Sequence, residues 1–360
     1  MASIEKRLRG AKTRWVVRYR TPDHLQRTKT FDRKVDAEQY LHSVETTKNV
    51  GDYVDPRLSK ITVDEWAQKW FAIKKSTITA KTFAGYEDTY NTHIKPRWGN
   101  VPLAQLRHEN VQEWVSSFTL ASATVRKNHR VLSMILSYAV KAGRLNKNVA
   151  DRIDLPRLRS KEKRFLSHKA VGRLVDAVEP HYQIVVLFLA YTGLRFGEMS
   201  ALRVHNLDLL RRRAIVCEAF SDVRGTLVLS DTKNHERREV PVPKFLADDL
   251  YLQLDGKGVD DLVFTSSSGA VLRSENFRKR VMVPASKVIG IEPGLTPHEL
   301  RHTAASLAIA AGADVKVVQQ MLGHRSATMT LDLYGHLFPD RLDQVAEALD
   351  SARISALKNF

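Results

Sequence analysis

A short basic stretch near the middle of this chain rules out a single continuous core. Residues 151–164 contain Pro156 and six basic side chains but few apolar ones, so the segment has little to bury. Such a composition is typical of a hinge. With 360 residues, the chain is long enough for two or three domains, and we expect them on either side of this linker.

The excess of positive charge lies almost wholly before the end of that linker. The chain has a formal net charge of +17, and residues 1–164 account for +16 of it. Trp and Tyr residues are interleaved with the basic ones there, a combination that favours a nucleic acid as partner over a merely solvated basic surface.

Cysteine usage and hydropathy exclude several classes of protein. The single cysteine, Cys217, allows no intrachain disulfide and no Cys-rich zinc site, and we expect it to be buried in the strand-like run 214–217. The first residues do not resemble a signal peptide, and the longest apolar run, residues 184–191, is too short to cross a membrane. We therefore expect a cytoplasmic protein associated with DNA, in a bacterial host and without a membrane partner.

Residues 1–60 show a β-rich pattern followed by one helix. Apolar side chains alternate with Arg14, Arg18 and Arg20, which predicts a strand with an arginine-lined face. A second strand is expected at 26–31, and a helix that covers the sheet should follow it. The arginine face fits a DNA groove; an ordinary solvent-facing strand is the alternative.

Residues 61–150 have a helical pattern. It begins with a capping box at Thr62 and Glu65, and apolar side chains then recur at helical spacing. The longest helix, from about Ala123 to near Gly143, starts with a basic turn. The candidates for phosphate contact in this helix and in the linker are Arg126, Lys127, Arg130, Arg157 and Arg159.

The chain beyond the linker mixes helical and β patterns and holds four short motifs. Residues 192–198 read TGLRFGE, residues 298–302 read HELRH, residues 322–324 read LGH, and Tyr334 follows ten residues after His324. Arginine matches phosphate oxygens with a planar, permanently charged fork, histidine moves protons near neutral pH, and tyrosine can form a covalent intermediate. These side chains together can attack a phosphodiester with a phenol.

The second motif is expected to open a helix. Thr296 fits the N-cap position and Glu299 the partner position of a capping box. His298, Arg301 and His302 then share one face of the first turns, where a helix N-terminus favours an anion such as phosphate.

The four motifs, in this order, resemble those of the tyrosine recombinases, and the layout of the chain is similar to a phage-type (lambda-like) integrase. The resemblance implies a multidomain, mainly α fold with small β-sheets. The implied parts are an arm-binding β-rich domain at 1–60, a helical core-binding domain at 61–150, a basic linker at 151–164, an α+β catalytic domain at 165–340 and a C-terminal helix for subunit contact at 341–360. The implied activity is site-specific recombination, in which DNA is cleaved and rejoined through a 3′-phosphotyrosyl bond to integrate or excise a mobile element.

The resemblance also implies roles for individual residues. The catalytic set that it implies comprises Arg195, Lys233, His298, Arg301, His324 and Tyr334. Tyr334 would attack the phosphate that Arg195 and Arg301 hold. Lys233 would protonate the leaving 5′-oxygen, with Arg237 and Lys244 as nearby alternatives.

The histidines and Glu198 complete that scheme. His298 would move a proton at the tyrosine, and His324 would hydrogen-bond the phosphate. Glu198 would orient the first arginine motif, while His302 is either catalytic support or an ordinary helix histidine.

Partners also follow from the resemblance. The scheme needs no metal and no nucleotide cofactor. It implies duplex DNA with core and arm attachment sites, a homotetramer on that DNA, and, as in the family, a host DNA-bending protein and an excision factor. The helix expected at 341–360 is either donated to a neighbouring subunit or folded back on its own domain.

Three other functions are weighed against this one. Residues 298–302 also match the HExxH pattern of zinc metalloproteases, but Ala305 and Ala308 replace the glycine and histidine of the extended pattern, and Arg301 would repel zinc. A non-catalytic DNA-binding regulator leaves the motifs unexplained. A type IB topoisomerase shares the nucleophile chemistry but does not account for the basic β-rich first domain.

Overall fold

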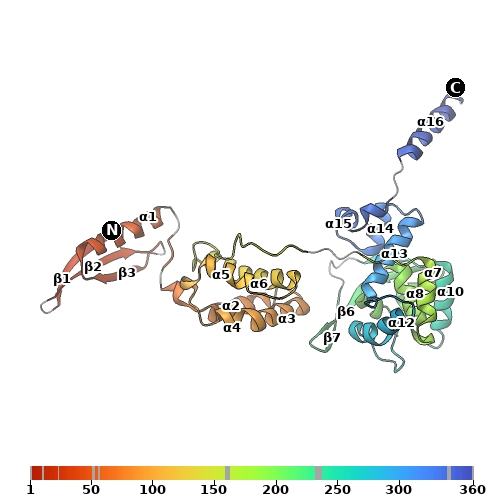
Figure 1. Ribbon diagram of the computed structural model, residues 1–360, viewed down its shortest axis with the longest axis horizontal. Helices are drawn as coiled ribbons and strands as arrows, with labels where there is room; N and C mark the ends of the chain where they lie inside the picture. Colours follow the sequence, from red (N-terminus) through yellow and green to blue (C-terminus); the bar gives the residue numbers. More distant parts are fainter. Residues whose placement is uncertain are drawn as a thin grey trace. The chain divides into compact units, whose positions relative to one another are not determined.

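The chain folds into two compact units, residues 1–160 and residues 161–360. The structure is a computed structural model (Figure 1) that describes residues 2–9, 12–22, 24–50, 53–55, 57–158, 163–231, 237–338 and 342–358. The described residues are mainly helical with small antiparallel sheets, so the predicted fold class is confirmed.

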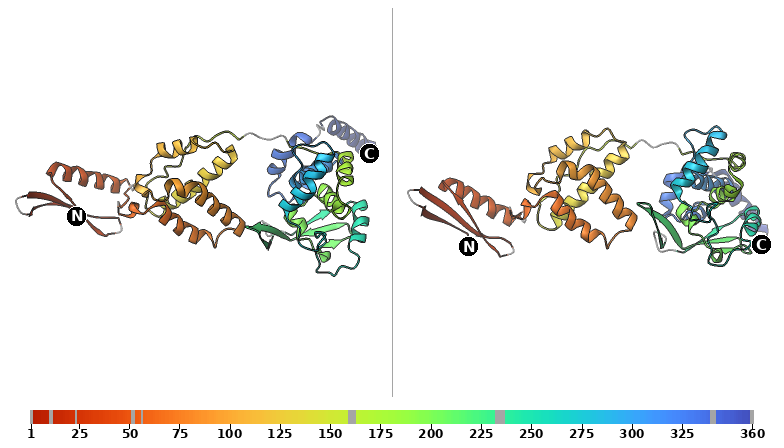
Figure 2. Two further views of the ribbon diagram at one scale, coloured as in Figure 1. Left: turned by 60° about the horizontal axis from the view of Figure 1, so that its bottom comes forward. Right: turned by 90° about the horizontal axis from the view of Figure 1, so that it is seen from below.

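The first unit begins with an antiparallel sheet of order β1-β2-β3, formed by Ser3–Arg9, Lys12–Arg20 and Gln26–Phe31. Helix α1 (Lys34–Asn49) covers one face (Figure 2), where Val17 and Tyr19 pack with Ala37 and Val44. The predicted arginines alternate with these buried residues along β2, as expected for a strand with one covered face. Strand β1 was not predicted, because it is an edge strand held by backbone pairing and has little apolar alternation.

The rest of this unit is helical. The capping box at Thr62 and Glu65 is present at the start of α2, where the Glu65 backbone N–H donates to the Thr62 hydroxyl. Trp66 and Trp70 lie in a core with Leu132 and Ile135 of the longest helix, as the apolar stripes predict. The helical segments are η1 (Leu58–Lys60), α2 (Val63–Lys74), α3 (Ala80–Thr89), η2 (Tyr90–Ile94), α4 (Lys95–Trp98), η3 (Leu103–Gln105), α5 (His108–Ser116) and α6 (Ser122–Lys141).

The second unit contains helices and two small sheets. One sheet has the order β4-β5-β8, and β6 pairs with β7 in a separate hairpin. Its strands are β4 (Leu207–Asp208), β5 (Arg213–Val216), β6 (Glu218–Val223), β7 (Thr226–Asp231) and β8 (Arg238–Pro241). Its helical segments are α7 (His168–Asp176), α8 (Pro180–Thr192), α9 (Phe196–Ser200), η4 (Val204–Asn206), α10 (Lys244–Gln253), α11 (Ser274–Phe277), η5 (Arg278–Met282), α12 (Val283–Val288), α13 (Pro297–Ala310), α14 (Val315–Leu322), α15 (Ala327–Tyr334), η6 (Gly335–Leu337) and α16 (Leu342–Lys358).

Helices α8 and α13 form the centre of the second unit. Phe188 and Leu189 of α8 share one buried cluster with Leu300 and Ala304 of α13. Helix α8 ends at Gly193, whose φ of +67° favours glycine and whose position leaves no room for a side chain: an added Cβ would lie 2.8 Å from Cδ2 of Leu322. This close approach brings the C-terminal ends of α8 and α14 together.

Helix α8 starts at Pro180, a residue that suits a first helical turn. One expectation about this unit differs from the structure. Cys217 is half-buried between β5 and β6 rather than buried in a strand, because the β5 ladder ends at Val216 and the chain changes sheet there.

The last helix, α16, presents apolar side chains to solvent. Leu349, Ile354 and Leu357 are 67%, 54% and 60% exposed. Among the described residues, no helix has both the length and the apolar content needed to span a membrane.

Candidate active site

Arg195 is positioned by the turn that joins α8 to α9. As the N-cap residue of α9, it donates its backbone N–H to the Glu198 carboxylate at 2.8 Å, and its Nη1 donates to the same carboxylate at 2.8 Å. Its Nη2 donates to the carbonyl of Gly323 at 3.3 Å. The side chain remains 41% exposed, so one part of the guanidinium is fixed while another faces solvent.

Glu198 is buried and joins two arginines. Arg238 on β8 donates to it through Nη1 at 3.1 Å and Nη2 at 2.6 Å, the two-pronged geometry of a strong ion pair. Burial alone would raise the pKa of Glu198, but the hydrogen bonds from Arg238 and the charges of Arg238 and Arg195 hold it below its ordinary value. Glu198 is therefore a carboxylate at neutral pH.

Arg301 on α13 is 3% exposed, and within the described part of the chain its guanidinium donates to two backbone carbonyls. Its Nη1 donates to Gly193 at 2.7 Å and its Nη2 to Leu322 at 2.6 Å. Burial, together with the positive charge of Arg195, lowers the pKa of Arg301 to about 9. This cation is thus held in place without a carboxylate directly on its guanidinium.

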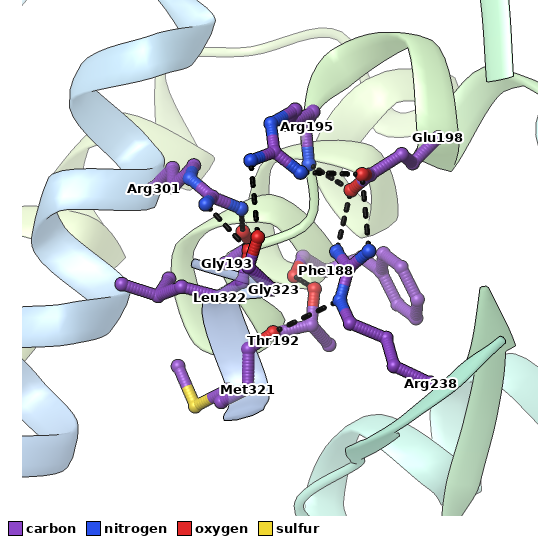
Figure 3. Close-up of polar contacts among 10 residues, drawn as sticks. All are labelled: Phe188, Thr192, Gly193, Arg195, Glu198, Arg238, Arg301, Met321, Leu322 and Gly323. Atoms are coloured by element: carbon purple, nitrogen blue, oxygen red, sulfur yellow. Dashed lines mark hydrogen bonds and ion pairs between the residues drawn. The ribbon is translucent and has the colours of Figure 1, made fainter. Parts of the chain in front are cut away.

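The three arginines converge on the ends of α8 and α14 (Figure 3). Only Glu198 balances Arg195, Arg238 and Arg301 within this hydrogen-bonded cluster, so the cluster keeps an excess of positive charge. Guanidinium groups that are pre-positioned in this way bind a phosphate without reorganisation. The arrangement is suited to an anion with several oxygens.

His302, which follows Arg301 on α13, forms a pair with Tyr334 of α15. His302 Nδ1 lies 2.7 Å from the hydroxyl of Tyr334, and its ring lies 4.7 Å from that of His298. Burial, followed by electrostatic repulsion from His298 and Lys163, lowers the pKa of His302 to about 4. His298 is exposed, and its pKa is also lowered, by desolvation and then by the charges of Arg301 and Arg195. Both rings are therefore neutral near pH 7.

Tyr334, the last residue of α15, is 1% exposed. Burial raises the pKa of its phenol to about 12, although the charge of Arg301 opposes the shift. The ring of His324 lies parallel to it, with centroids 6.4 Å apart and planes at 6°. His324 Nδ1 is 3.0 Å from the Thr330 hydroxyl, and burial, followed by Arg301 and Arg195, lowers its pKa to about 4.

Most of the predicted site residues are brought together. Arg195 contacts Glu198, and Tyr334 contacts His302 and His324. The expected capping at Thr296 is present, since its N–H donates to Glu299 at 2.7 Å.

Lys233 lies outside the described residues. The strands on either side of it are not partners, because β7 pairs with β6 and β8 pairs with β5.

Two residues near the site were not predicted. Arg238 was passed over, although it lies two residues before the buried Val240 on β8 and so shares its inward face. Lys163, at the end of the basic linker, donates to the carbonyl of Leu333 at 3.0 Å. Nothing in its local sequence distinguishes it from the other linker cations.

The candidate DNA contacts have varied surroundings. Arg14 is paired with Asp32 at 3.6 Å and Arg18 with Glu5 at 3.1 Å, both at the surface. Arg126 donates to the carbonyl of Pro156 at 2.9 Å. The exposed candidates are Arg20, Lys127, Arg130 and Arg157, while Arg159 lies outside the described residues.

The geometry gives no support to a zinc site. His302 Nδ1 is engaged by Tyr334, and the Glu299 carboxylate is engaged by Arg164 at 2.6 Å and by Thr296. Across the residues that the structure describes, no cluster of three or more His, Cys, Asp or Glu side chains is placed to hold a metal ion.

Comparison with protein families matches both units of the chain. Residues 164–341 match the phage integrase family, and residues 62–118 match the phage integrase N-terminal SAM-like domain. The integrase of Mycobacterium phage D29 is 27% identical over 323 residues, which cover 84% of each chain. The integrase of Mycobacterium phage L5 is 26% identical over 340 residues, which cover 89% of each chain.

Solved structures show the same fold. The Tn1549 transposon integrase, in complex with a circular intermediate DNA, matches with a TM-score of 0.68 at 19% identity, over 81% of this chain and 99% of that one. The lambda integrase tetramer bound to a Holliday junction matches with a TM-score of 0.61 at 16% identity, over 90% and 96%. With the arginine cluster and the buried tyrosine, these likenesses lead to one conclusion: the chain belongs to the phage integrase family and is a tyrosine-type site-specific recombinase.

Proposed function

We propose that this recombinase breaks and rejoins duplex DNA through a covalent bond between Tyr334 and the 3′-phosphate of the cleaved strand. The observation that carries the proposal is that Arg301, one member of the arginine cluster, directly precedes on α13 the histidine that contacts the Tyr334 hydroxyl. Attack by the phenol displaces the 5′-oxygen. Because the phosphotyrosyl bond keeps the energy of the phosphodiester, a 5′-hydroxyl from another duplex reverses the step.

Arg195 and Arg301 hold the non-bridging phosphate oxygens in this scheme. Arg195 is part-exposed and can meet the phosphate directly. Arg301 has further N–H groups beyond the two that bond to carbonyls, and a buried cation gains most from an incoming anion because no water screens the pair. Arg238 acts through Glu198, which it keeps ionised so that Arg195 stays in position.

Proton transfer at the phenol is assigned to His302. Its Nδ1 is the ring nitrogen in contact with Tyr334, and its lowered pKa keeps a lone pair available there at neutral pH. The sequence predicts this role for His298. We propose instead that His298, whose ring contacts His302 and is exposed, contacts the phosphate. His324 uses Nδ1 for Thr330, so we assign Nε2 to the phosphate.

Lys233 remains our proposed donor of a proton to the 5′-oxygen. The chain on its far side leads directly into β8, where Arg238 is tied to the site. Lys233 precedes that anchor by five residues in the sequence.

The partners that we propose are two kinds of DNA site and further copies of the chain. The integrase structures named above contain DNA, and the lambda protein is tetrameric on its junction. We propose that the arginine face of the β1-β2-β3 sheet holds arm sites, that α6 and the linker hold core sites, and that α16 packs on a neighbouring subunit. A cytoplasmic location, an accessory bending protein and an excision factor belong to the same proposal.

The proposal is tested with labelled duplexes that carry candidate attachment sequences and a nick. Purified protein is incubated with them in EDTA, beside Tyr334→Phe. We expect an adduct that survives a denaturing gel, persists in EDTA and is lost in the variant. If both proteins bind a verified attachment site tightly and neither forms the adduct, the catalytic assignment is wrong.

A further inference from the structure

The end of the basic linker contacts the segment that carries the proposed nucleophile. Lys163 Nζ donates to the carbonyl of Leu333 at 3.0 Å and lies 5.7 Å from the centre of the Tyr334 ring. Leu333 is in the last turn of α15, where carbonyls lack partners within the helix and a cation is favoured. Lys163 therefore caps the helix that ends in Tyr334.

Phe165 makes a second contact with the same segment. Its ring centre lies 6.5 Å from that of Tyr334, 6.5 Å from that of His302 and 6.1 Å from that of His336. It thus touches both partners of the hydrogen bond between His302 and Tyr334, as well as His336 in the 3-10 turn η6. Removing Phe165 would loosen that pair from one side.

The residues between and after these two are anchored to α13. Arg164 donates to the Glu299 carboxylate at 2.6 Å and to the carbonyl of Pro293 at 2.6 Å. The backbone N–H of Leu166 donates to the Thr303 hydroxyl at 3.2 Å. Arg164 and Leu166 therefore contact α13. Lys163 and Phe165, which alternate with them, contact the end of α15.

We propose that Lys163 and Phe165 form a clasp which keeps Tyr334 buried against His302, and that DNA opens it by drawing Lys163 from Leu333 onto a phosphate. The proposal rests on the function proposed above, because a phenol that is 1% exposed must leave its pocket before it can attack. A phosphate competes well for this lysine, since a charged acceptor forms a stronger hydrogen bond than a neutral carbonyl. Lys163 and Phe165 are positioning residues in this scheme: they act through α15 and do not touch the reacting atoms.

The first test measures hydrogen exchange in the DNA-free, full-length protein. Lys163→Met keeps the apolar stem but removes the donor, and we expect amides in peptides that cover residues 326–338 to exchange about fivefold faster. Lys163→Arg should restore slow exchange. Lys169→Met, which changes an exposed lysine on α7, is the matched control and should leave these peptides unchanged. Unaltered exchange in Lys163→Met would overturn the clasp.

The second test distinguishes a clasp that DNA opens from a variant that only loosens the end of α15. Phe165→Leu should also speed exchange at 326–338 but should leave the salt dependence of DNA binding as it is. Lys163→Met should reduce the slope of log affinity against log salt by about 0.9, the value for one duplex phosphate contact. If Lys163→Met leaves the slope unchanged, DNA does not draw this lysine away. Neither measurement uses strand cleavage, so failure of the Tyr334 chemistry would not alter them.

Discussion

His302 Nδ1 and the hydroxyl of Tyr334 lie 2.7 Å apart, whereas His298 meets this pair only through the His302 ring. The first histidine of the HELRH motif begins the exposed turn of α13, and the second faces the buried end of α15. The proton acceptor for the phenol is therefore expected at the second histidine.

Replacing the two histidines separately tests that assignment. We expect His302→Gln to slow single-turnover cleavage of a nicked duplex about 100-fold or more, because a positioned general base typically contributes that much. His298→Gln should slow it less, with DNA affinity close to that of the wild type in both. A larger defect in His298→Gln than in His302→Gln would return the role to His298.

Acid should destabilise the second unit. The pKa values of His302 and His324 are lowered to about 4, so the unfolded chain binds protons at these sites before the folded one does. The contribution of the two neutral histidines to the free energy of unfolding is complete above pH 6.5. It is lost as the pH falls from 6.5 toward 4, by about 1–2 kcal/mol per histidine at pH 5.

The measurement can separate the two units because every tryptophan precedes residue 115. Urea unfolding followed by tryptophan fluorescence reports the first unit, while circular dichroism reports both. We expect a pH-dependent loss of stability that circular dichroism detects and tryptophan fluorescence does not. This loss should be smaller in His324→Gln. A loss equal in wild type and variant would mean that another group titrates.

Arg238→Met should uncouple Glu198 from β8. Breaking one side of a buried ion pair leaves an uncompensated charge, and we expect a loss of roughly 2–4 kcal/mol of stability. Cleavage should fall about 10- to 100-fold because Arg195 loses its fixed support. Arg237→Met, an exposed neighbour, is the control. Adding Glu198→Gln to Arg238→Met should recover stability without recovering cleavage; recovery of both would mean that the pair only stabilises the fold.

Gly193→Ala should damage both the fold and the site. The new Cβ would lie 2.8 Å from Leu322 at a φ of +67°, and the shift would displace the carbonyl that holds Arg301. We expect a cost of about 2–3 kcal/mol and slower cleavage. Gly256→Ala is matched in φ, at +73°, but has open space around it, so it should cost about 1 kcal/mol and leave cleavage intact. Equal effects would show that backbone strain alone matters.

The sheet of the first unit offers a matched pair of arginines. Arg20 is exposed on β2, whereas Arg27 on β3 is tied to Asp55 at 2.8 Å. We expect Arg20→Gln to weaken binding to an arm-type duplex and to lower its salt slope by about one. Arg27→Gln should leave that slope unchanged and slightly destabilise the unit. The reverse pattern would place DNA on the other face.

Local signals made much of this site predictable. The turn after α8, the cap of α13 and the glycine before His324 are each specified within a few residues, so Arg195, Arg301 and His324 lie where their motifs predict. The four motifs converge because α8, α13, α14 and α15 pack in one unit around a shared core.

What was missed depends on contacts between distant segments. Arg238 matters because β8 brings it to Glu198, forty residues away in sequence, and no local pattern encodes that pairing. The choice between His298 and His302 depends on where α15 ends, and the contact of Lys163 with Leu333 spans 170 residues. Edge strand β1 has too little apolar alternation to be recognised alone.

The most direct measurement is to identify the residue that carries the DNA. The covalent adduct is digested with nuclease and trypsin, and the peptides are analysed by mass spectrometry. We predict a nucleotide mass on the peptide of residues 326–341, located by fragmentation at Tyr334. A nucleotide on any other tyrosine, or an adduct that forms unchanged in Tyr334→Phe, would contradict the account.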